Sequence, residues 1–196
     1  MSAVNPATTT QEKTPLSASD WEHAALELIA EKGVSALAVE PLARRLGITK
    51  GSFYWHFASR DELLVQALKR WERRDIEHLA RSLDSGEPAA DRLAEFILRT
   101  SRQNTSHQIH AALCAASDHP RVKPVIERIT RRRLEYLAKA FRELGLADEA
   151  AHHRARLTYT SYVGYIQLQT RGMAPERGSE EFEAYVRHAI ATLISN

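Results

Sequence analysis

From residue 17 to the C-terminus, the sequence is a succession of helix-forming segments, and this feature restricts the possible folds most. Along each segment, apolar residues recur at spacings of three and four, as on the buried face of an amphipathic helix. The sequence shows neither the alternation of a strand hairpin nor an internal repeat. The chain is therefore predicted to be all-α. Residues 1–16, rich in Thr, Ala and Pro, are predicted to form a flexible tail.

Breaks between the segments predict where each helix begins and ends. Ser19 to Glu22 and Ser59 to Glu62 have the Ser-x-x-Glu pattern of a capping box, which satisfies N–H groups at a helix start. Gly33 and Gly47 follow apolar segments, as helix-ending glycines do. The predicted helices cover residues 19–32, 39–46, 49–57, 59–83, 89–106, 108–117, 122–144, 148–171 and 179–194.

Composition restricts the class of protein and the compartment. The chain has 196 residues, 43% of them hydrophobic, which is enough for one domain or two small domains with a real core. No apolar run approaches the roughly 18 residues of a membrane span, and no secretory signal opens the sequence. The single cysteine, Cys114, excludes an internal disulfide and a cysteine-based metal site. We therefore expect a cytoplasmic protein without a membrane segment.

Charge is uneven along the chain, although the net charge is only +2. From Pro41 to Arg60 the sequence contains basic residues, among them Lys50, and no Asp or Glu. Such a segment suits a surface that faces phosphates, because neutralising them releases counterions and favours binding. A solvated basic face is the alternative that charge alone leaves open.

Two short predicted helices flank the turn at Gly47, and apolar residues would lock them together. The residues expected to pack between the helices are Val39, Leu42, Ala43, Leu46, Ile48, Phe53 and Phe57. Phe53, Trp55 and Phe57 are expected to be packing residues, with stacking on bases as the alternative. Thr49, Lys50, Ser52, Tyr54 and His56 then remain as polar groups on and around the second helix. A helix placed in the major groove presents such side chains to base edges, while its flanks reach phosphates.

The run LARRLGITKGSFYWHFASRDELL, residues 42–64, resembles the DNA-binding signature of the tetracycline-repressor (TetR) family. The similarity extends over about residues 17–70 and weakens beyond them. It implies a three-helix helix-turn-helix domain over residues 17–63 and a helical effector-binding and dimerisation domain over residues 64–196. One position departs from the family pattern, since Ala38 stands where Ser or Thr commonly caps the first helix of the motif. Either the helix start shifts or Ser35 replaces the missing cap.

The resemblance implies which residues contact double-stranded DNA. Side chains at the start of the second helix would face bases or nearby phosphates, Gly51 would allow close backbone approach, and the flanking groups would donate to phosphates. Arg44 and Arg45 would touch the DNA backbone or stay solvated. The predicted DNA-binding residues are Arg44, Arg45, Thr49, Lys50, Gly51, Ser52, Tyr54, His56 and Arg60.

The last two predicted helices carry apolar residues suited to a homodimer. A single recognition helix reads only a few base pairs, so specificity usually comes from a two-fold dimer on a palindrome. The predicted interface consists of Val163, Ile166, Phe182, Tyr185, Val186, Ala189, Ile190 and Leu193. The alternative is that these residues fill the core of one subunit.

The resemblance also implies a pocket for a small effector among the middle helices. An aromatic and aliphatic lining suits a mostly apolar molecule that would shift the protein between DNA-binding states. The predicted lining is Trp71, Phe96, His110, Cys114, Tyr162 and Tyr165, with Gln169 as a polar anchor. Each of these residues has core packing as its alternative. The break at residues 86–88 would let the preceding long helix pivot.

Other chemistries are less well supported by the sequence. His107 lies three residues from His110, and His152 adjoins His153, but adjacent helix residues point in different directions and no HExxH or CxxC spacing occurs. We therefore expect surface histidines, no metal and no cofactor, and we expect the run of arginines at 131–133 to be solvated. The sequence predicts a repressor and not an enzyme. A helical enzyme or ligand-binding protein with a similar segment, and an activator, remain alternatives.

Overall fold

The computed structural model describes residues 16–83, 86–102 and 104–194, and every regular element in these ranges is helical. The all-α prediction is confirmed for this part of the chain, while the predicted tail lies outside the described residues except for Leu16. The elements are α1 (Ala18–Lys32), a 3₁₀ turn η1 (Val34–Ala36), α2 (Val39–Leu46), α3 (Lys50–Phe53), α4 (Arg60–Leu83), α5 (Ala89–Arg102), α6 (Asn104–Ala115), α7 (Lys123–Glu143), α8 (Asp148–Gln169) and α9 (Glu180–Ile194).

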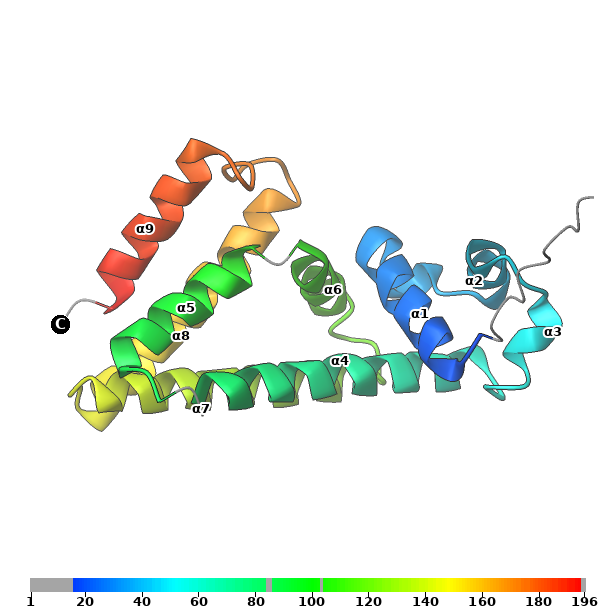
Figure 1. Ribbon diagram of the computed structural model, residues 1–196, viewed down its shortest axis with the longest axis horizontal. Coiled ribbons are helices and arrows are strands. Elements are labelled where there is room, and N and C mark those ends of the chain that lie inside the picture. Colours follow the sequence, from blue (N-terminus) through cyan, green and yellow to red (C-terminus); the bar gives the residue numbers. More distant parts are fainter. Residues whose placement is uncertain (1–15, 84–85, 103, 195–196) are drawn as a thin grey trace, which may run out of the picture.

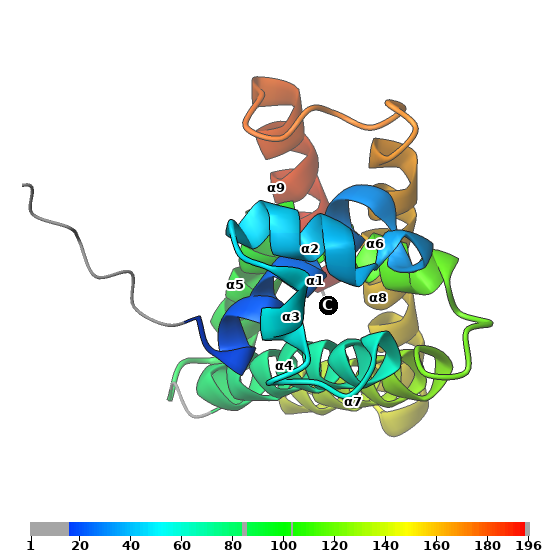
Figure 2. The same cartoon turned by 90° about the vertical axis from the view of Figure 1, so that its right-hand side faces the viewer.

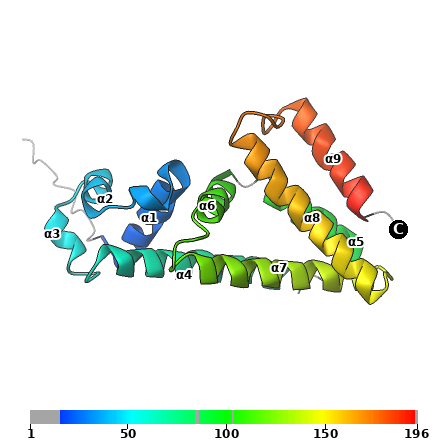
Figure 3. The same ribbon diagram turned by 180° about the vertical axis from the view of Figure 1, so that it is seen from behind.

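The molecule is elongated, and α4 connects its two ends (Figure 1). Helices α1, α2 and α3 gather at one end, and Figure 2 looks onto that end with α3 in front. Helices α5, α8 and α9 form the other end, α7 lies along α4, and α6 stands between the two groups (Figures 1 and 3). No helix in the described ranges is long and apolar enough to cross a membrane.

Helix α1 begins with a different capping residue from the one predicted. Asp20 Oδ2 accepts hydrogen bonds from both the N–H (2.7 Å) and the Oγ (2.8 Å) of Ser17, so Ser17 caps the helix and the box predicted at Ser19 is wrong. Ser19 instead accepts a hydrogen bond from Arg70 of α4. The physical reason is that the side chain of Asp20 already meets the N–H of Ser17, two residues before the predicted pair of Ser19 and Glu22.

The box predicted at α4 is confirmed in its first half. The N–H of Glu62 donates to Ser59 Oγ at 3.1 Å, as a capping box requires. The carboxylate of Glu62 reaches one residue farther than the motif predicts and accepts from the N–H of Ala58 at 2.7 Å. Either bond satisfies an N–H group that the helix itself leaves unpaired.

The helix predicted over residues 49–57 is shorter than expected. Helix α3 ends at Phe53, because the N–H groups of His56 and Phe57 both donate to the Phe53 carbonyl, at 2.9 and 3.0 Å, and the chain tightens into a turn. At the other side of the motif the prediction holds. Gly47 has φ 68° and ψ 31°, the left-handed conformation that ends α2.

One core joins the N-terminal end to the middle of the molecule. It contains Trp21 of α1, Leu42 of α2 and Phe53 of α3, all fully buried, together with Ile109 and Leu113 of α6. Helix α1 packs directly against both α4 and α6. The domain boundary predicted between residues 63 and 64 therefore does not separate two cores, because α6 belongs to the core of the N-terminal domain.

The apolar stripe of α9 faces inward, contrary to part of the dimer prediction. Phe182 and Val186 are each 2% exposed and Ile166 of α8 is 3% exposed, so these three residues pack inside a single subunit. Helix α9 lies against α5 and α8, which cover that stripe. Of the remaining predicted interface residues, Tyr185 is exposed, and Val163, Ala189, Ile190 and Leu193 are partly buried.

Candidate DNA-binding surface and ligand cavities

The exposed surface of α3 carries most of the predicted DNA-binding residues. Thr49, Lys50, Gly51 and Tyr54 are exposed, and Ser52 and His56 are half-buried. These residues lie together on one short helix and the turn that follows it, at the end of the molecule (Figure 2). The structure therefore brings this part of the predicted set onto one surface.

Aromatic packing beneath α3 fixes this surface. Phe53 is fully buried and meets the ring of Trp21 edge-on, with 5.3 Å between ring centroids. Phe57 lies 5.5 Å from Phe53 on the same measure and is also buried. Because side chains on opposite faces of a short helix point apart, these anchors leave Lys50 and Tyr54 directed outward.

Trp55 is a further candidate on this surface, for which the sequence favours packing over stacking on bases. The prediction that it packs inside is wrong, since its side chain is 88% exposed. Residue 55 lies in the turn after α3, two residues from each of the buried Phe53 and Phe57, and so points away from their side. A large aromatic side chain in full contact with water beside Tyr54 (59% exposed) marks an interaction surface.

The basic residues of the motif divide into free and paired groups. Lys50 is exposed, and Arg44 reaches only Glu40, at 3.9 Å. Arg45 is paired with Glu31 and lies 3.9 Å from Glu27, both on α1. The hydrogen bond from Arg45 lowers the pKa of the Glu31 carboxyl. The charge of Arg45 is thus largely balanced within the protein.

Arg60 is engaged in holding α4 to the rest of the motif. Its Nε donates to the Leu37 carbonyl at 2.6 Å and its Nη2 donates to the Val34 carbonyl at 3.1 Å. Its Nη1 lies 3.3 Å from Asp61. We therefore assign Arg60 a positioning role and leave it out of the proposed phosphate contacts.

The fold itself does not require a glycine at position 51. Gly51 is absent from the glycines with positive φ, and a Cβ added there would meet only Thr49 Oγ1, at 3.8 Å. That separation is an ordinary van der Waals contact. Any requirement for glycine at this position must therefore come from a molecule that approaches α3 from outside.

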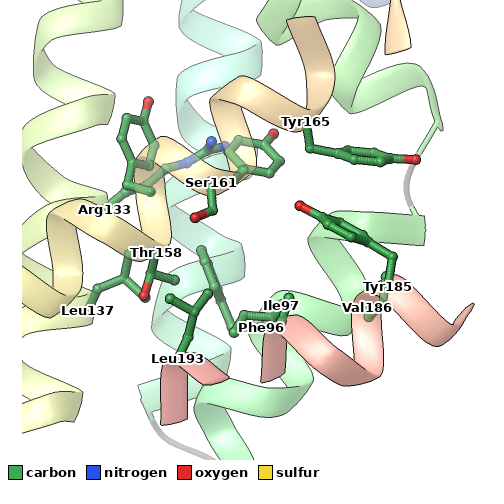
Figure 4. Close-up of a pocket in the computed structure, with 13 residues that line it drawn as sticks. Phe96, Ile97, Arg133, Leu137, Thr158, Ser161, Tyr165, Tyr185, Val186 and Leu193 are labelled. Carbon is green, nitrogen blue, oxygen red and sulfur yellow. The ribbon is translucent and has the colours of Figure 1, made fainter. Parts of the chain in front are cut away.

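Two adjoining cavities lie in the other half of the protein. The first, with a volume of ≈ 40 Å³, lies among α5, α7, α8 and α9 (Figure 4). The second, with a volume of ≈ 180 Å³, is enclosed by α4, α5, α6, α7 and α8. Phe96, Arg133 and Tyr162 line both cavities and so form the wall between them.

Four of the predicted pocket residues line these cavities. Trp71, Phe96 and Tyr162 line the second cavity, and Tyr165 lines the first, where its ring stacks on that of Tyr185 at 5.3 Å (Figure 4). The other predicted pocket residues, His110, Cys114 and Gln169, line neither cavity.

His110 belongs to a buried hydrogen-bond network behind the cavity wall. Its Nε2 lies 3.2 Å from the hydroxyl of Tyr159, which lies 3.0 Å from Thr130 Oγ1. The sulfur of Cys114 is 3.7 Å from His110 Nδ1. These groups satisfy one another inside the subunit, which accounts for their place outside the cavities.

The second cavity contains a buried ion pair that the sequence analysis did not find. Arg133 donates from Nε (2.9 Å) and Nη2 (2.7 Å) to the same oxygen, Asp75 Oδ1. The prediction of a solvated arginine run holds for Arg131 and is wrong for Arg133, whose side chain is 7% exposed. The signal was present, because Arg133 lies four residues from both Ile129 and Leu137 and so shares their apolar helix face.

Two histidines beside this ion pair are held neutral. His107 and His110 are 2% and 1% exposed, so the expectation of surface histidines is wrong for both. Burial, with a smaller contribution from nearby positive charge (Arg177 and Arg133 for His107, Arg133 for His110), lowers the pKa of each to about 3. Uncharged imidazoles therefore line the space around Arg133.

The second histidine pair does face water. His152 and His153 lie 3.6 Å from Asp148 and Glu149, respectively, at the start of α8. Within the described ranges, no group of three or more metal-binding side chains comes together.

Comparison with known sequences finds a family match for the N-terminal part of the chain. Residues 23–67 match the family described as "Bacterial regulatory proteins, tetR family". The chain is similar to the tetracycline repressor protein class D of Escherichia coli, with 38% identity over 78 residues. This match covers 40% of the chain and only 33% of the repressor, so the chain spans about a third of the length of that relative.

Comparison with solved structures extends to nearly the whole chain but concerns the fold alone. A TetR transcriptional regulator from Legionella pneumophila superposes with a TM-score of 0.77 and 18% identity, covering 98% of this chain and all of its own. A regulator from Saccharomonospora viridis, solved in complex with choline, has a TM-score of 0.73 and 19% identity and covers 90% of this chain and 92% of its own. The helices beyond residue 67 are thus arranged as in those regulators.

Proposed function

By its DNA-binding domain the chain belongs to the tetR family of bacterial regulatory proteins, and from this premise we propose that it is a transcriptional repressor. The repressor binds a palindromic operator as a homodimer and releases it when a small molecule enters the C-terminal half. A single observation carries the proposal, namely that exposed Lys50, Tyr54 and Trp55 stand on a rigid aromatic base at one end of the molecule.

The surface of α3 supports contact with the major groove. Thr49 and Ser52 offer hydroxyls of the length that reaches base edges, and Lys50 offers an unpaired positive charge to a phosphate. Trp55 and Tyr54 add apolar area and a phenolic hydroxyl beside them. Arg44, exposed on α2, is the flanking phosphate contact in this proposal.

A face of α8 supports pairing of two subunits. Leu157 and Leu168 are 57% and 43% exposed, and the exposed residues Ser161 and Gly164 lie between them on the same helical face. Apolar and small side chains in this arrangement permit close approach of a second copy of the helix. A two-fold dimer through α8 explains why a palindromic operator is expected.

Helix α6 supports coupling between the cavity and the DNA-binding surface. His107 and Ile109 of α6 line the second cavity, and Ile109 also belongs, with Leu113, to the core around α1. A molecule that displaces α6 therefore acts directly on α1, and α1 supports Phe53 beneath α3. This route replaces the pivot predicted at residues 86–88. Only a ligand with different affinities for the two states shifts the equilibrium.

The experiment is a selection of DNA fragments with the purified full-length chain, followed by affinity measurement at several salt concentrations. We expect an inverted repeat, with an affinity that falls steeply as salt rises. Lys50→Ala should reduce the salt slope by about one and weaken binding to all sequences, while Trp55→Ala should weaken the selected sequence most.

The matched control is Arg131→Ala, which removes one exposed positive charge from α7 instead of α3. Its affinity for the selected fragment should stay close to that of the wild type. Recovery of random fragments at moderate salt, or equal losses in Lys50→Ala and Arg131→Ala, would refute the proposed DNA-binding role. It would favour a helical enzyme or ligand-binding protein instead.

A further inference from the structure

We propose that the second cavity binds a small aromatic monocarboxylate, so that the effector is an anion with a flat apolar body. The inference rests on the proposed function for the role of the ligand as effector, but its chemical part stands on the cavity alone. Three buried polar atoms of the residues that line this cavity have no hydrogen-bond partner, and two of them are nitrogens that can donate.

The first donor is Nη1 of Arg133. The other two nitrogens of this buried guanidinium donate to one oxygen of Asp75, and Nη1 has no hydrogen-bond partner. A buried guanidinium nitrogen without an acceptor is costly, and the Tyr162 ring, whose centroid lies 5.7 Å from the guanidinium carbon, compensates for only part of the lost hydration. An oxygen atom of a ligand in the cavity would supply the missing acceptor.

The second donor is Nδ1 of His107, which is also buried and without a partner. Because the imidazole stays neutral at physiological pH, Nδ1 carries a proton in one of its two tautomers and then acts as a donor. His107 and Arg133 both line the second cavity. A carboxylate has two oxygens and so offers one to each.

The third unpaired atom, Asp75 Oδ2, faces a different cation. Nη1 of Arg132 is also without a hydrogen-bond partner and lies 3.9 Å from this oxygen. The positive charge of Arg132 therefore compensates the negative charge at Asp75 Oδ2. Asp75 Oδ2 therefore accepts no hydrogen bond from Nη1 of Arg133, which stays available to a ligand.

The charges around the cavity favour an anion. Glu72 and Asp75 of α4 pair with Arg128, Arg132 and Arg133 of α7, which leaves one positive charge more than negative. Within this group only Arg133 and Asp75 are buried and line the cavity, while Arg128 is half exposed, so the surplus positive charge attracts an anion from the α7 side of the cavity. Exposed Arg74 also lines the cavity and adds a second positive charge to its wall.

The size and walls of the cavity favour a single aromatic ring. Trp71, Phe96 and Tyr162 line it, and aromatic faces and edges stack well on a flat ring. Cavities of about 150 Å³ accept benzene. The volume of ≈ 180 Å³ therefore accommodates one ring with a small substituent.

The test compares three probes of nearly equal shape, benzoate, benzamide and benzamidinium, titrated into the full-length protein by calorimetry at pH 7. We expect benzoate to bind at least about tenfold more tightly than either of the others, as charged hydrogen bonds in a buried site would give. Tighter binding of benzamide or benzamidinium, equal binding of all three, or no binding of any would overturn the inference.

Variants test the residues that the inference names. Arg133→Gln should weaken benzoate at least about tenfold, whereas Arg128→Gln, which removes the same charge outside the cavity, should weaken it less than about threefold. Asp75→Asn keeps Nη1 of Arg133 and removes a negative charge, so it should tighten benzoate. Equal effects of Arg133→Gln and Arg128→Gln would overturn the assignment of Arg133. If Arg133→Gln does not fold, the ranking of the three probes still decides the outcome.

Operator binding in the presence of benzoate separates the two proposals. If benzoate binds as expected and leaves the affinity for DNA unchanged, the ligand class is supported and the effector role is refuted. If the protein binds no DNA, the proposed function fails, while the ranking of the probes still decides the inference about the cavity.

Discussion

Replacing Gly51 by alanine should separate the requirements of the fold from those of DNA. Within the protein, the added Cβ meets only Thr49 Oγ1, at 3.8 Å, and the backbone of residue 51 does not need positive φ. Alanine also restricts the unfolded chain more than glycine does. Gly51→Ala should therefore raise the free energy of unfolding by about 0.4–1 kcal/mol.

The same substitution should weaken DNA binding. Gly51 is exposed on α3 between Lys50 and Ser52, so an approaching duplex meets the new methyl group where it now meets bare backbone. We expect at least about a tenfold loss of affinity for the selected operator, or about 1.4 kcal/mol. Stability is measured by urea denaturation and affinity by fluorescence anisotropy with a labelled operator.

Gly47→Ala is the matched contrast. Gly47 has φ 68°, so alanine there is strained and should lower the free energy of unfolding by about 1 kcal/mol. Gly51→Ala should therefore have the higher free energy of unfolding of the two variants and the lower affinity for the operator. Wild-type DNA affinity in a folded Gly51→Ala protein would refute the close approach of DNA to α3. A loss of stability in that variant would refute the geometry described around residue 51.

Three further predictions concern helix capping, pH and pairing. Ala38 is the N-cap of α2 and makes no cap hydrogen bond, so Ala38→Ser should raise the free energy of unfolding by about 1 kcal/mol in urea denaturation, and no gain would contradict the described helix start. His107 and His110, with pKa lowered to about 3 from an unfolded value near 6.5, remain neutral where the unfolded chain takes up protons. The free energy of unfolding should thus reach its full value above pH 6.5 and fall by about 3 kcal/mol per pH unit below it. His107→Gln should show about half that slope, and a flat profile between pH 6.5 and 5.5 would contradict the burial of the two histidines. Leu168→Asp, at an exposed position on α8, should convert the proposed dimer to a monomer in analytical ultracentrifugation, and an unchanged mass would exclude this face as the interface.

Local sequence alone determined the architecture of the DNA-binding end. The turn at Gly47 and the cap at Ser59 depend on neighbours within a few residues, and the apolar pattern identifies Leu42, Phe53 and Phe57 as inward-facing; all were predicted. Such features follow from backbone conformation and from the helical repeat, which a single sequence contains in full. Trp55 was mispredicted because its large apolar ring favours burial, whereas α3 ends at Phe53 and the turn that follows leaves the ring exposed.

Tertiary structure alone decided which polar residues are paired. Arg45 meets Glu31 of α1, Arg60 meets backbone carbonyls of η1 and its neighbour, and Arg133 meets Asp75, 58 residues away in the sequence. Helical periodicity reports that a position faces inward, but it does not report whether a partner from another helix arrives there. A buried charge is stable only with such a partner. The cavity and its unpaired donors therefore emerged only once α4, α6 and α7 were placed side by side.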